Sequence, residues 1–199
     1  MRVYIINLTR RKKIYVCVIL CCILFFLCLF SLIKFFFPLK YFDSIKKYSD
    51  KYNLEPSLIC AIIYTESKFN PNAISHKDAI GLMQIKKSTA DWLAKKFEIK
   101  NCDSQKLFNP DFNINLGCFY FKYLLSKLDY DYDLAFCAYN AGLGNLSKWL
   151  DKYSHDKKKL FYIPFDETKN YLSRVHFYQK VYKIIIKLHI KNKDQKSDI

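Results

Sequence analysis

Glycine and proline are scarce in this sequence, which has 4 glycines and 5 prolines among its 199 residues. A sandwich or barrel of many short strands needs more of these turn-forming residues, so the composition favours a mainly helical fold. Hydrophobic residues make up 51% of the chain and aromatic residues 18%, which is enough apolar side chain for a real core. The length fits one domain of ordinary size and an extension.

The sequence patterns of several common kinds of site are also missing. We find no phosphate-binding glycine loop, no nucleophile elbow and no cluster of metal ligands, so we expect neither a metal nor a cofactor. No basic recognition helix or aromatic RNA-binding motif is present, so nucleic acid is not an expected partner. The histidines are scattered and are expected at the surface: His76, His155, His176 and His189.

Acidic residues are absent from the first 40 positions, where a long apolar run occupies residues 14–33. About 20 helical residues cross a bilayer, and the basic residues at 10–13 favour a cytoplasmic N-terminus. We therefore predict a single-pass signal anchor, with residues 1–13 in the cytoplasm, 34–47 as a juxtamembrane linker and the rest of the chain outside. A cleaved signal peptide is the alternative, but no small-x-small cleavage site follows this run.

The net charge of the whole chain is +15, and the part after the apolar run is basic as well. A basic exported domain is expected to bind an anionic partner, such as a cell-wall polymer or a membrane surface. Four of the eight cysteines lie in the apolar run, where cysteine behaves as a small hydrophobic residue. We expect the other four to be buried free thiols, with a disulfide as the alternative in an exported protein: Cys60, Cys102, Cys118 and Cys137.

Apolar periodicity and capping residues predict a domain over 48–190 that is mainly helical, of the α+β class. Helices are expected at 56–67, 109–124, 131–141, 145–150 and 166–190, and Ser88 is expected to cap a helix through Phe97. A short amphipathic helix or juncture is expected at 41–53. The remaining segments are expected to be irregular: 72–85 with short strands, loops at 101–108 and 153–164, and a charged, frayed tail at 191–199.

An ionisable group stands at the end of one apolar stripe. Ile59, Ile62 and Ile63 repeat at helical spacing, and Glu66 falls on the same face shortly before an Asn-Pro pair that ends the helix. Burial among apolar neighbours raises the pKa of a carboxyl group, and a general acid needs a pKa near neutral pH. Glu66 is therefore a candidate catalytic residue. The alternative is a solvated glutamate at the edge of the stripe.

Four blocks of sequence follow one another in order between Glu66 and Val175. The first two are Glu-Ser-Lys-Phe-Asn-Pro-Asn-Ala at 66–73 and Ala-Ile-Gly-Leu-Met-Gln-Ile at 79–85. The third is Asn-Pro at 109–110, with Asn-Ile at 113–114 and Gly117, leading to Ala-Tyr-Asn-Ala-Gly at 138–142. The fourth is Ile-Pro-Phe-Asp-Glu-Thr at 163–168, with Tyr171 and Arg-Val at 174–175. Together these blocks resemble the lytic transglycosylases of the soluble-lytic-transglycosylase type, which are relatives of goose-type lysozyme. The resemblance covers roughly residues 48–185.

The resemblance implies a lysozyme-like transglycosylase domain that cleaves peptidoglycan glycan strands between N-acetylmuramic acid and N-acetylglucosamine. It implies that Glu66 protonates the leaving oxygen and then removes the proton from the sugar 6-hydroxyl, which closes a 1,6-anhydro ring without water. Tyr139 and Asn140 would orient Glu66 and the acetamido group, and a helix dipole would hold Glu167 ionised. The positions that match the family's site are Ser75, Met83, Gln84, Tyr139, Asn140, Glu167 and Tyr171.

Taken singly, some of these residues have structural explanations, such as a turn for Ser75 and a gap filler for Met83. The sequence also departs from the family pattern. Lysines stand at 86–87, where the family usually has a proline, and Asp78 stands where glycine is frequent. Aspartate tolerates left-handed backbone better than most residues, so the turn is expected to survive.

Asp78 also raises a rival interpretation, because a second carboxylate near the motif could activate water. The protein would then be a muramidase resembling goose-type lysozyme, a hydrolase whose product is a reducing sugar. A non-enzymatic cell-wall-binding protein on the same fold is a further alternative. Glu66 together with Tyr139 and Asn140 favours an enzyme, since a binding module does not need the acid.

Overall fold

The structure is a computed structural model that describes residues 2–99, 103–156 and 158–197. The chain forms two units, Met1–Leu39 and Lys40–Ile199. The first unit is one helix, α1 (Arg2–Phe36). Within its part Lys12–Phe36, an 18-residue window has a mean hydropathy of 3.2 and is not buried, and by length and composition this part could cross a membrane. The second unit therefore contains the whole described core, which begins at Ile45.

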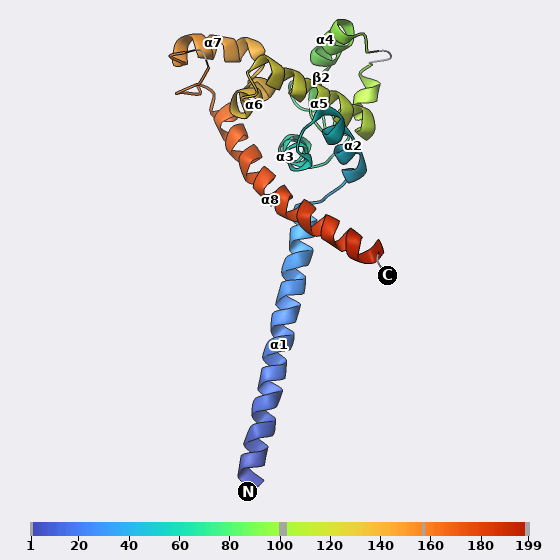
Figure 1. Ribbon diagram of the computed structural model, residues 1–199, viewed down its shortest axis with the longest axis vertical. Coiled ribbons are helices and arrows are strands. Elements are labelled where there is room, and N and C mark those ends of the chain that lie inside the picture. The colour runs from blue at the N-terminus through green and yellow to red at the C-terminus, as the bar shows by residue number, and fades with distance from the viewer. Residues whose placement is uncertain (1, 100–102, 157, 198–199) are drawn as a thin grey trace. The chain divides into compact units, whose positions relative to one another are not determined.

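Helices make up most of the second unit, as the composition predicts (Figure 1). They are α2 (Phe42–Tyr52), α3 (Pro56–Ser67), α4 (Lys87–Phe97), a 3-10 turn η1 (Gln105–Phe108), α5 (Pro110–Lys127), α6 (Tyr132–Ala141), α7 (Leu143–Tyr153) and α8 (Asp166–Ser197). Two residue types that cap helices well begin α5 and α6. The Asn109 side chain accepts a hydrogen bond from the Phe112 N–H, and the Asp131 side chain accepts one from Leu134.

Helix α3 lies at the centre of the core and packs against α2 and α8 (Figure 1). All seven residues from Ser57 to Ile63 are buried, because this helix is apolar around most of its circumference. Aromatic rings continue the packing onto α8, where Tyr64 meets Tyr178 at 4.6 Å between ring centroids and Phe69 meets Tyr182 at 5.9 Å. The end of α3, which carries Glu66, is therefore held firmly.

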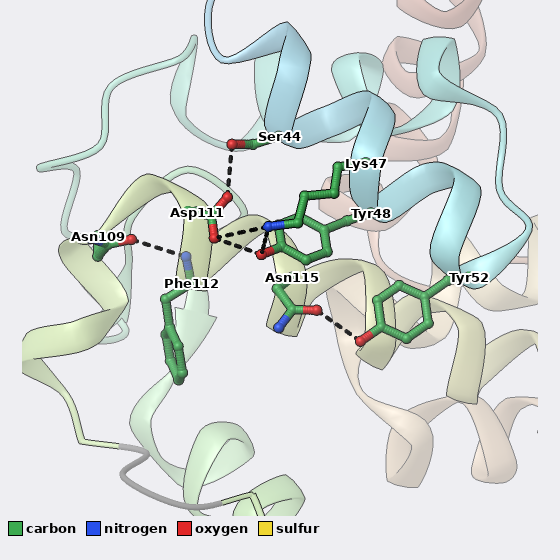
Figure 2. A network of polar contacts seen from close by, with 8 residues as sticks. All are labelled: Ser44, Lys47, Tyr48, Tyr52, Asn109, Asp111, Phe112 and Asn115. Carbon is green, nitrogen blue, oxygen red and sulfur yellow. Dashed lines mark hydrogen bonds and ion pairs between the residues drawn. The ribbon is translucent and has the colours of Figure 1, made fainter.

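Polar contacts tie α2 to the start of α5 (Figure 2). The Asp111 carboxylate accepts hydrogen bonds from the Ser44 hydroxyl at 2.8 Å and from the Tyr48 hydroxyl at 2.5 Å. One turn further along, the Tyr52 hydroxyl donates to the Asn115 side-chain oxygen at 2.8 Å. These bonds explain why α2 belongs to the folded unit. Helix α2 lies within 41–53, where the sequence predicts a short amphipathic helix or juncture, and its Ile45 is fully buried.

The segment 72–85 is irregular with two short strands, as predicted. Strand β1 (Ala79–Ile80) pairs antiparallel with β2 (Ile85–Lys86), with Ile80 opposite Ile85. Asp78 has a φ of 56° and Gly81 a φ of 80°, so the chain reverses through left-handed backbone at both positions. The expectation that aspartate would preserve this turn is confirmed.

Several elements differ from the expected ones in their bounds. The helix predicted to be capped by Ser88 begins at Lys87 instead, because β2 runs directly into it and Lys86 is its extended N-terminal residue. The predicted loop 101–108 contains the turn η1, and α7 begins at Leu143 rather than at 145. Helix α8 continues to Ser197, past the predicted end at 190, because no glycine or proline interrupts it.

Three of the four cysteines predicted to be buried free thiols are confirmed as such: Cys60, Cys118 and Cys137. Burial raises the pKa of the Cys60 and Cys118 thiols far above the ordinary value, so both stay protonated. Cys102 lies outside the described residues.

Candidate active site

A cleft of about 550 Å³ opens beside the end of α3. Its walls come from α3, the β1–β2 segment, the start of α4, α5, α6, α7 and the first turn of α8. Six of the eight candidate residues line this cleft: Glu66, Ser75, Gln84, Tyr139, Asn140 and Glu167. Segments as far apart in the chain as Glu66 and Glu167 therefore bring the predicted residues to one place.

Glu66 is the second-last residue of α3, and the helix ends at Lys68, which has left-handed backbone. Its carboxyl group sits at the end of the buried stripe that contains Ile59, Ile62 and Ile63. Burial raises the pKa of Glu66 from its ordinary value of 4.5 to about 7. Interactions with Tyr171 and Arg174 lower this pKa in part, and the charge of Glu167 raises it. A large fraction of Glu66 is therefore protonated near neutral pH.

Two tyrosines accompany Glu66. Tyr171 is 2% exposed. Within the described residues its buried hydroxyl makes no hydrogen bond of ordinary geometry. Its interaction with Glu66 nevertheless lowers the pKa of the Glu66 carboxyl group. The Tyr139 hydroxyl donates to the Met83 carbonyl at 2.7 Å. Burial and the charge of Glu66 raise the pKa of both tyrosines well above the ordinary value. Both hydroxyls therefore remain hydrogen-bond donors.

Met83 and Tyr171 lie behind the cleft and are not part of its lining. The Met83 side chain is fully buried and packs against Gly117, where an added Cβ would lie 2.3 Å from the Met83 sulfur. Met83 thus fills the space that a glycine on α5 leaves. Its contribution to the cleft is its backbone carbonyl, which fixes the Tyr139 ring.

Ser75 and Gln84 shape the loop wall of the cleft. The Ser75 hydroxyl accepts hydrogen bonds from the backbone N–H groups of Lys77 at 3.2 Å and Ala79 at 3.1 Å, which is a turn-forming arrangement. The Gln84 side-chain nitrogen donates to the backbone carbonyls of Ala73 at 3.1 Å and Gly81 at 2.9 Å. Both side chains hold the loop in its conformation while they line the cleft.

Asn113, on α5, anchors this loop from below. Its side-chain oxygen accepts from the Met83 N–H at 2.8 Å, and its side-chain nitrogen donates to the carbonyls of Ile80 at 3.0 Å and Leu107 at 2.8 Å. The residue is completely buried. Sequence reasoning assigned no role to Asn113, although a polar residue among the apolar positions of α5 is a usable signal, because a buried amide must find partners.

Glu167 and Asn140 line the cleft as well. The Lys77 ammonium lies 3.0 Å from the Glu167 carboxylate, and the hydrogen bond from Lys77 is the main cause that lowers the pKa of Glu167. The charge of His76 and a hydrogen bond with Asn140 lower it further. The Asn140 side-chain oxygen accepts from the Thr168 hydroxyl at 2.7 Å. Glu167 is thus held ionised chiefly by a lysine that the sequence did not identify.

The cleft therefore combines one carboxyl group that is easily protonated with one that stays ionised. Such a pair suits general acid and base chemistry at Glu66, with charge stabilisation from Glu167. Asp78, the carboxyl group considered as a base for water, is exposed and does not line the cleft. Within residues 2–99, 103–156 and 158–197, no group of three or more His, Cys, Asp or Glu side chains could hold a metal ion.

The raised pKa of Glu66 predicts a specific dependence of stability on pH. Between about pH 4.5 and 7 the folded state keeps a proton that the unfolded chain has lost, so rising pH lowers the free energy of unfolding in this window. Replacing Glu66→Gln removes this cost. We expect the variant to be more stable than the natural protein by about 1 to 3 kcal/mol near pH 8 and equally stable near pH 4.

Urea unfolding of both proteins at the two pH values measures this difference. Glu98→Gln is the matched control, because it makes the same chemical change at an exposed position. An equal effect of Glu66→Gln at both pH values would contradict a buried, titrating carboxyl group.

Comparison with known proteins agrees with this geometry. Residues 43–162 match the family model of the Transglycosylase SLT domain. A soluble lytic murein transglycosylase of Escherichia coli K12 is 34% identical over 151 residues, which cover 74% of this chain and 23% of that protein. A membrane-bound lytic murein transglycosylase C of Photorhabdus laumondii is 34% identical over 169 residues, which cover 72% of this chain and 46% of that protein. The matched part of the chain thus spans 23% and 46% of the length of these two relatives.

Solved structures give the same picture. An inactive mutant of the lytic transglycosylase Slt from Pseudomonas aeruginosa, with glutamine in place of a glutamate, aligns with a TM-score of 0.67 and 32% identity. The alignment covers 76% of this chain and 25% of that one. The 70 kDa soluble lytic transglycosylase of Escherichia coli aligns with a TM-score of 0.69 and 32% identity over 79% of this chain and 26% of its own. The lysozyme-like fold expected from the sequence is therefore confirmed.

Proposed function

Since this chain belongs to the Transglycosylase SLT domain family, we propose that it is a membrane-anchored lytic transglycosylase of peptidoglycan. The bond it cleaves is the β-1,4 bond between N-acetylmuramic acid and N-acetylglucosamine. The observation that carries this proposal is Glu66, a carboxyl group with a pKa of about 7 at the wall of the cleft. The relatives act on murein by their names, which supports the same substrate here.

In the first step, the protonated Glu66 carboxyl donates its proton to the glycosidic oxygen as the bond from the muramyl C1 breaks. Positive charge develops on the muramyl ring. The substrate's acetamido oxygen can stabilise this charge from the opposite side, and the ionised Glu167 adds a favourable field. Asn140, held by Thr168, is placed to donate its side-chain N–H to the acetamido group or to Glu167.

In the second step, Glu66 is ionised and acts as a base. It removes the proton from the muramyl 6-hydroxyl, whose oxygen then bonds to C1 and closes the 1,6-anhydro ring. Glu66 ends the cycle protonated, and no water is consumed. One carboxyl group suffices for both steps, which agrees with a cleft whose other carboxylate, Glu167, is paired with Lys77. The hydroxyl of Tyr171, whose interaction lowers the pKa of Glu66, supports the ionised form of Glu66 between the steps.

A hydrolase of the goose-type-lysozyme kind is the main alternative and needs a base for water. Asp78 was the candidate for this role, and its position outside the cleft lining favours the non-hydrolytic reaction. A purely wall-binding protein is disfavoured because a buried carboxyl group with a raised pKa reduces stability at neutral pH and brings nothing to binding.

The anchor in this proposal is α1. Its apolar part Lys12–Phe36 is long enough to span a bilayer, and membrane-bound relatives occur among the matching proteins. The basic residues at 10–13 favour an N-terminus in the cytoplasm and a catalytic unit outside it, where peptidoglycan lies.

Mass spectrometry of the muropeptides released from purified peptidoglycan tests the reaction. Residues 40–199 contain the whole described core and are the material for this assay. We expect products with 1,6-anhydro-muramyl ends, one water lighter than hydrolytic fragments. Products with reducing ends would identify a muramidase instead. Retained binding to peptidoglycan without any product would indicate a wall-binding protein.

A further inference from the structure

Helix α8 has a second apolar face that turns away from the core. Phe177, Val181, Ile184 and Leu188 follow one another at spacings of three and four residues, which places them in one row along the helix. We call this row the outward stripe. Phe177 is 58% exposed, Ile184 64% and Leu188 48%. Scattered apolar residues on a surface are normal, but a row of four along one helix face is a patch that needs a partner.

The core-facing side of α8 is already occupied by other residues. Tyr171, Val175, Tyr182 and Ile186 are buried, and at 100° per residue their row lies opposite the outward stripe. The outward stripe is therefore not required to fold the unit. Helix α8 is apolar on two faces, and only one of them is used by the described chain.

The charge around the outward stripe has one sign. Between residues 168 and 191, α8 has no acidic residue and six basic ones. Lys180, Lys187 and Lys191 lie three or four residues from members of the stripe and so flank it along the same side. Lys183 is on a different face, where it pairs with Glu55 at 3.1 Å. An apolar row beside a row of lysines is the pattern of a helix that lies on an anionic membrane surface.

We propose that the outward stripe of α8 docks on an anionic lipid surface, with Ile184 and Leu188 entering the acyl boundary and the flanking lysines contacting lipid phosphates. This inference rests on the proposed membrane anchoring by α1. Residues 37–39 join α1 to the second unit and span about 10 Å when extended, so an inserted α1 holds that unit at the bilayer. Within the unit, the rings of Phe42 and His189 meet at 5.3 Å, so the stripe ends beside the start of the unit.

A second copy of the chain is a less suitable partner. An antiparallel two-fold pair of α8 helices packed through the stripe would bring the lysine rows of the two copies close together, and like charges repel. Anionic lipid neutralises the same lysines, and each lysine near such a surface contributes favourably. The charge pattern therefore favours lipid over self-association.

Sedimentation with lipid vesicles tests the proposal on residues 40–199, which lack α1. The vesicles contain phosphatidylcholine with about one third phosphatidylglycerol, and pure phosphatidylcholine vesicles show the contribution of charge. We expect binding to the anionic vesicles, and we expect Ile184→Ser to weaken the partition coefficient about tenfold. Ile190→Ser is the matched control, because Ile190 is also exposed on α8 but lies outside the stripe, and it should change the coefficient less than about twofold.

Three results would overturn the proposal. These are no binding to anionic vesicles, equal losses for Ile184→Ser and Ile190→Ser, or a dimer in light scattering that Ile184→Ser dissolves while lipid binding is absent. Thermal unfolding verifies that both variants are folded. Muropeptide release from lipid-free peptidoglycan should be the same for both variants. A protein that binds vesicles but releases no muropeptides would count against the proposed function and not against lipid binding by the outward stripe.

Discussion

Glu66→Gln is expected to lower the rate of muropeptide release from peptidoglycan by at least about 100-fold, which is the lower range for loss of a general acid. The glutamine has nearly the same shape but cannot donate a proton to the glycosidic oxygen or accept one from the 6-hydroxyl. Both steps of the proposed reaction use this one carboxyl group, so no second residue in the cleft can replace it. The measurement is the initial rate of anhydro product formation.

The control variant for this experiment is Glu98→Gln, which makes the same chemical change at an exposed position outside the cleft and should keep the natural rate. Sedimentation with peptidoglycan should be unchanged in Glu66→Gln, since the cleft keeps its shape. A variant that releases muropeptides at the natural rate would remove Glu66 from the mechanism. A variant that neither binds nor folds would make the rate uninformative, and the urea unfolding described above distinguishes that case.

Asn113→Ala is expected to destabilise the folded protein by about 3 to 5 kcal/mol. The side chain makes three hydrogen bonds, and their loss would leave the Met83 N–H and the carbonyls of Ile80 and Leu107 buried without these partners. These groups hold the loop that carries Gln84 into the cleft. We therefore expect the rate of product release to fall as well. Urea unfolding gives the change in free energy.

Asn115→Ala on the same helix is the matched control. Asn115 is partly exposed and accepts one hydrogen bond, from the Tyr52 hydroxyl (Figure 2). Water can replace that partner, so the expected cost is about 1 kcal/mol or less. Similar costs for the two variants would mean that the buried bonds of Asn113 do not determine the conformation of the loop.

Much of the site was predictable from the sequence because its signals are local or belong to motifs. The stripe of Ile59, Ile62 and Ile63 predicts both the burial of α3 and the raised pKa of Glu66, and both are found. The helices expected from 109 and from 131 begin there, because the side chains of Asn109 and Asp131 accept hydrogen bonds from their own first turns and need no tertiary partner.

The remaining features depend on contacts between distant segments. Lys77 meets Glu167 across 90 residues, and no local pattern distinguishes that lysine from its neighbours on the surface. Asn113 reaches Met83 and Ile80 across about 30 residues in the same way. Met83 was grouped with residues of the site because it lies within the motif, and the motif includes residues that fill space behind the cleft. The motif alone does not distinguish residues that line the cleft from residues that fill space behind it. The packing in the structure does.

The buried thiols Cys60 on α3 and Cys118 on α5 provide a way to measure how often these helices open. Cys60 and Cys118 have no exposed surface, and a protonated, shielded thiol reacts very slowly with alkylating reagents. Modification of either thiol requires that its helix open, so the labelling rate measures the equilibrium between closed and open forms. Cys60 lies on α3, the helix that also carries Glu66. Its labelling rate therefore measures how often α3 leaves the core.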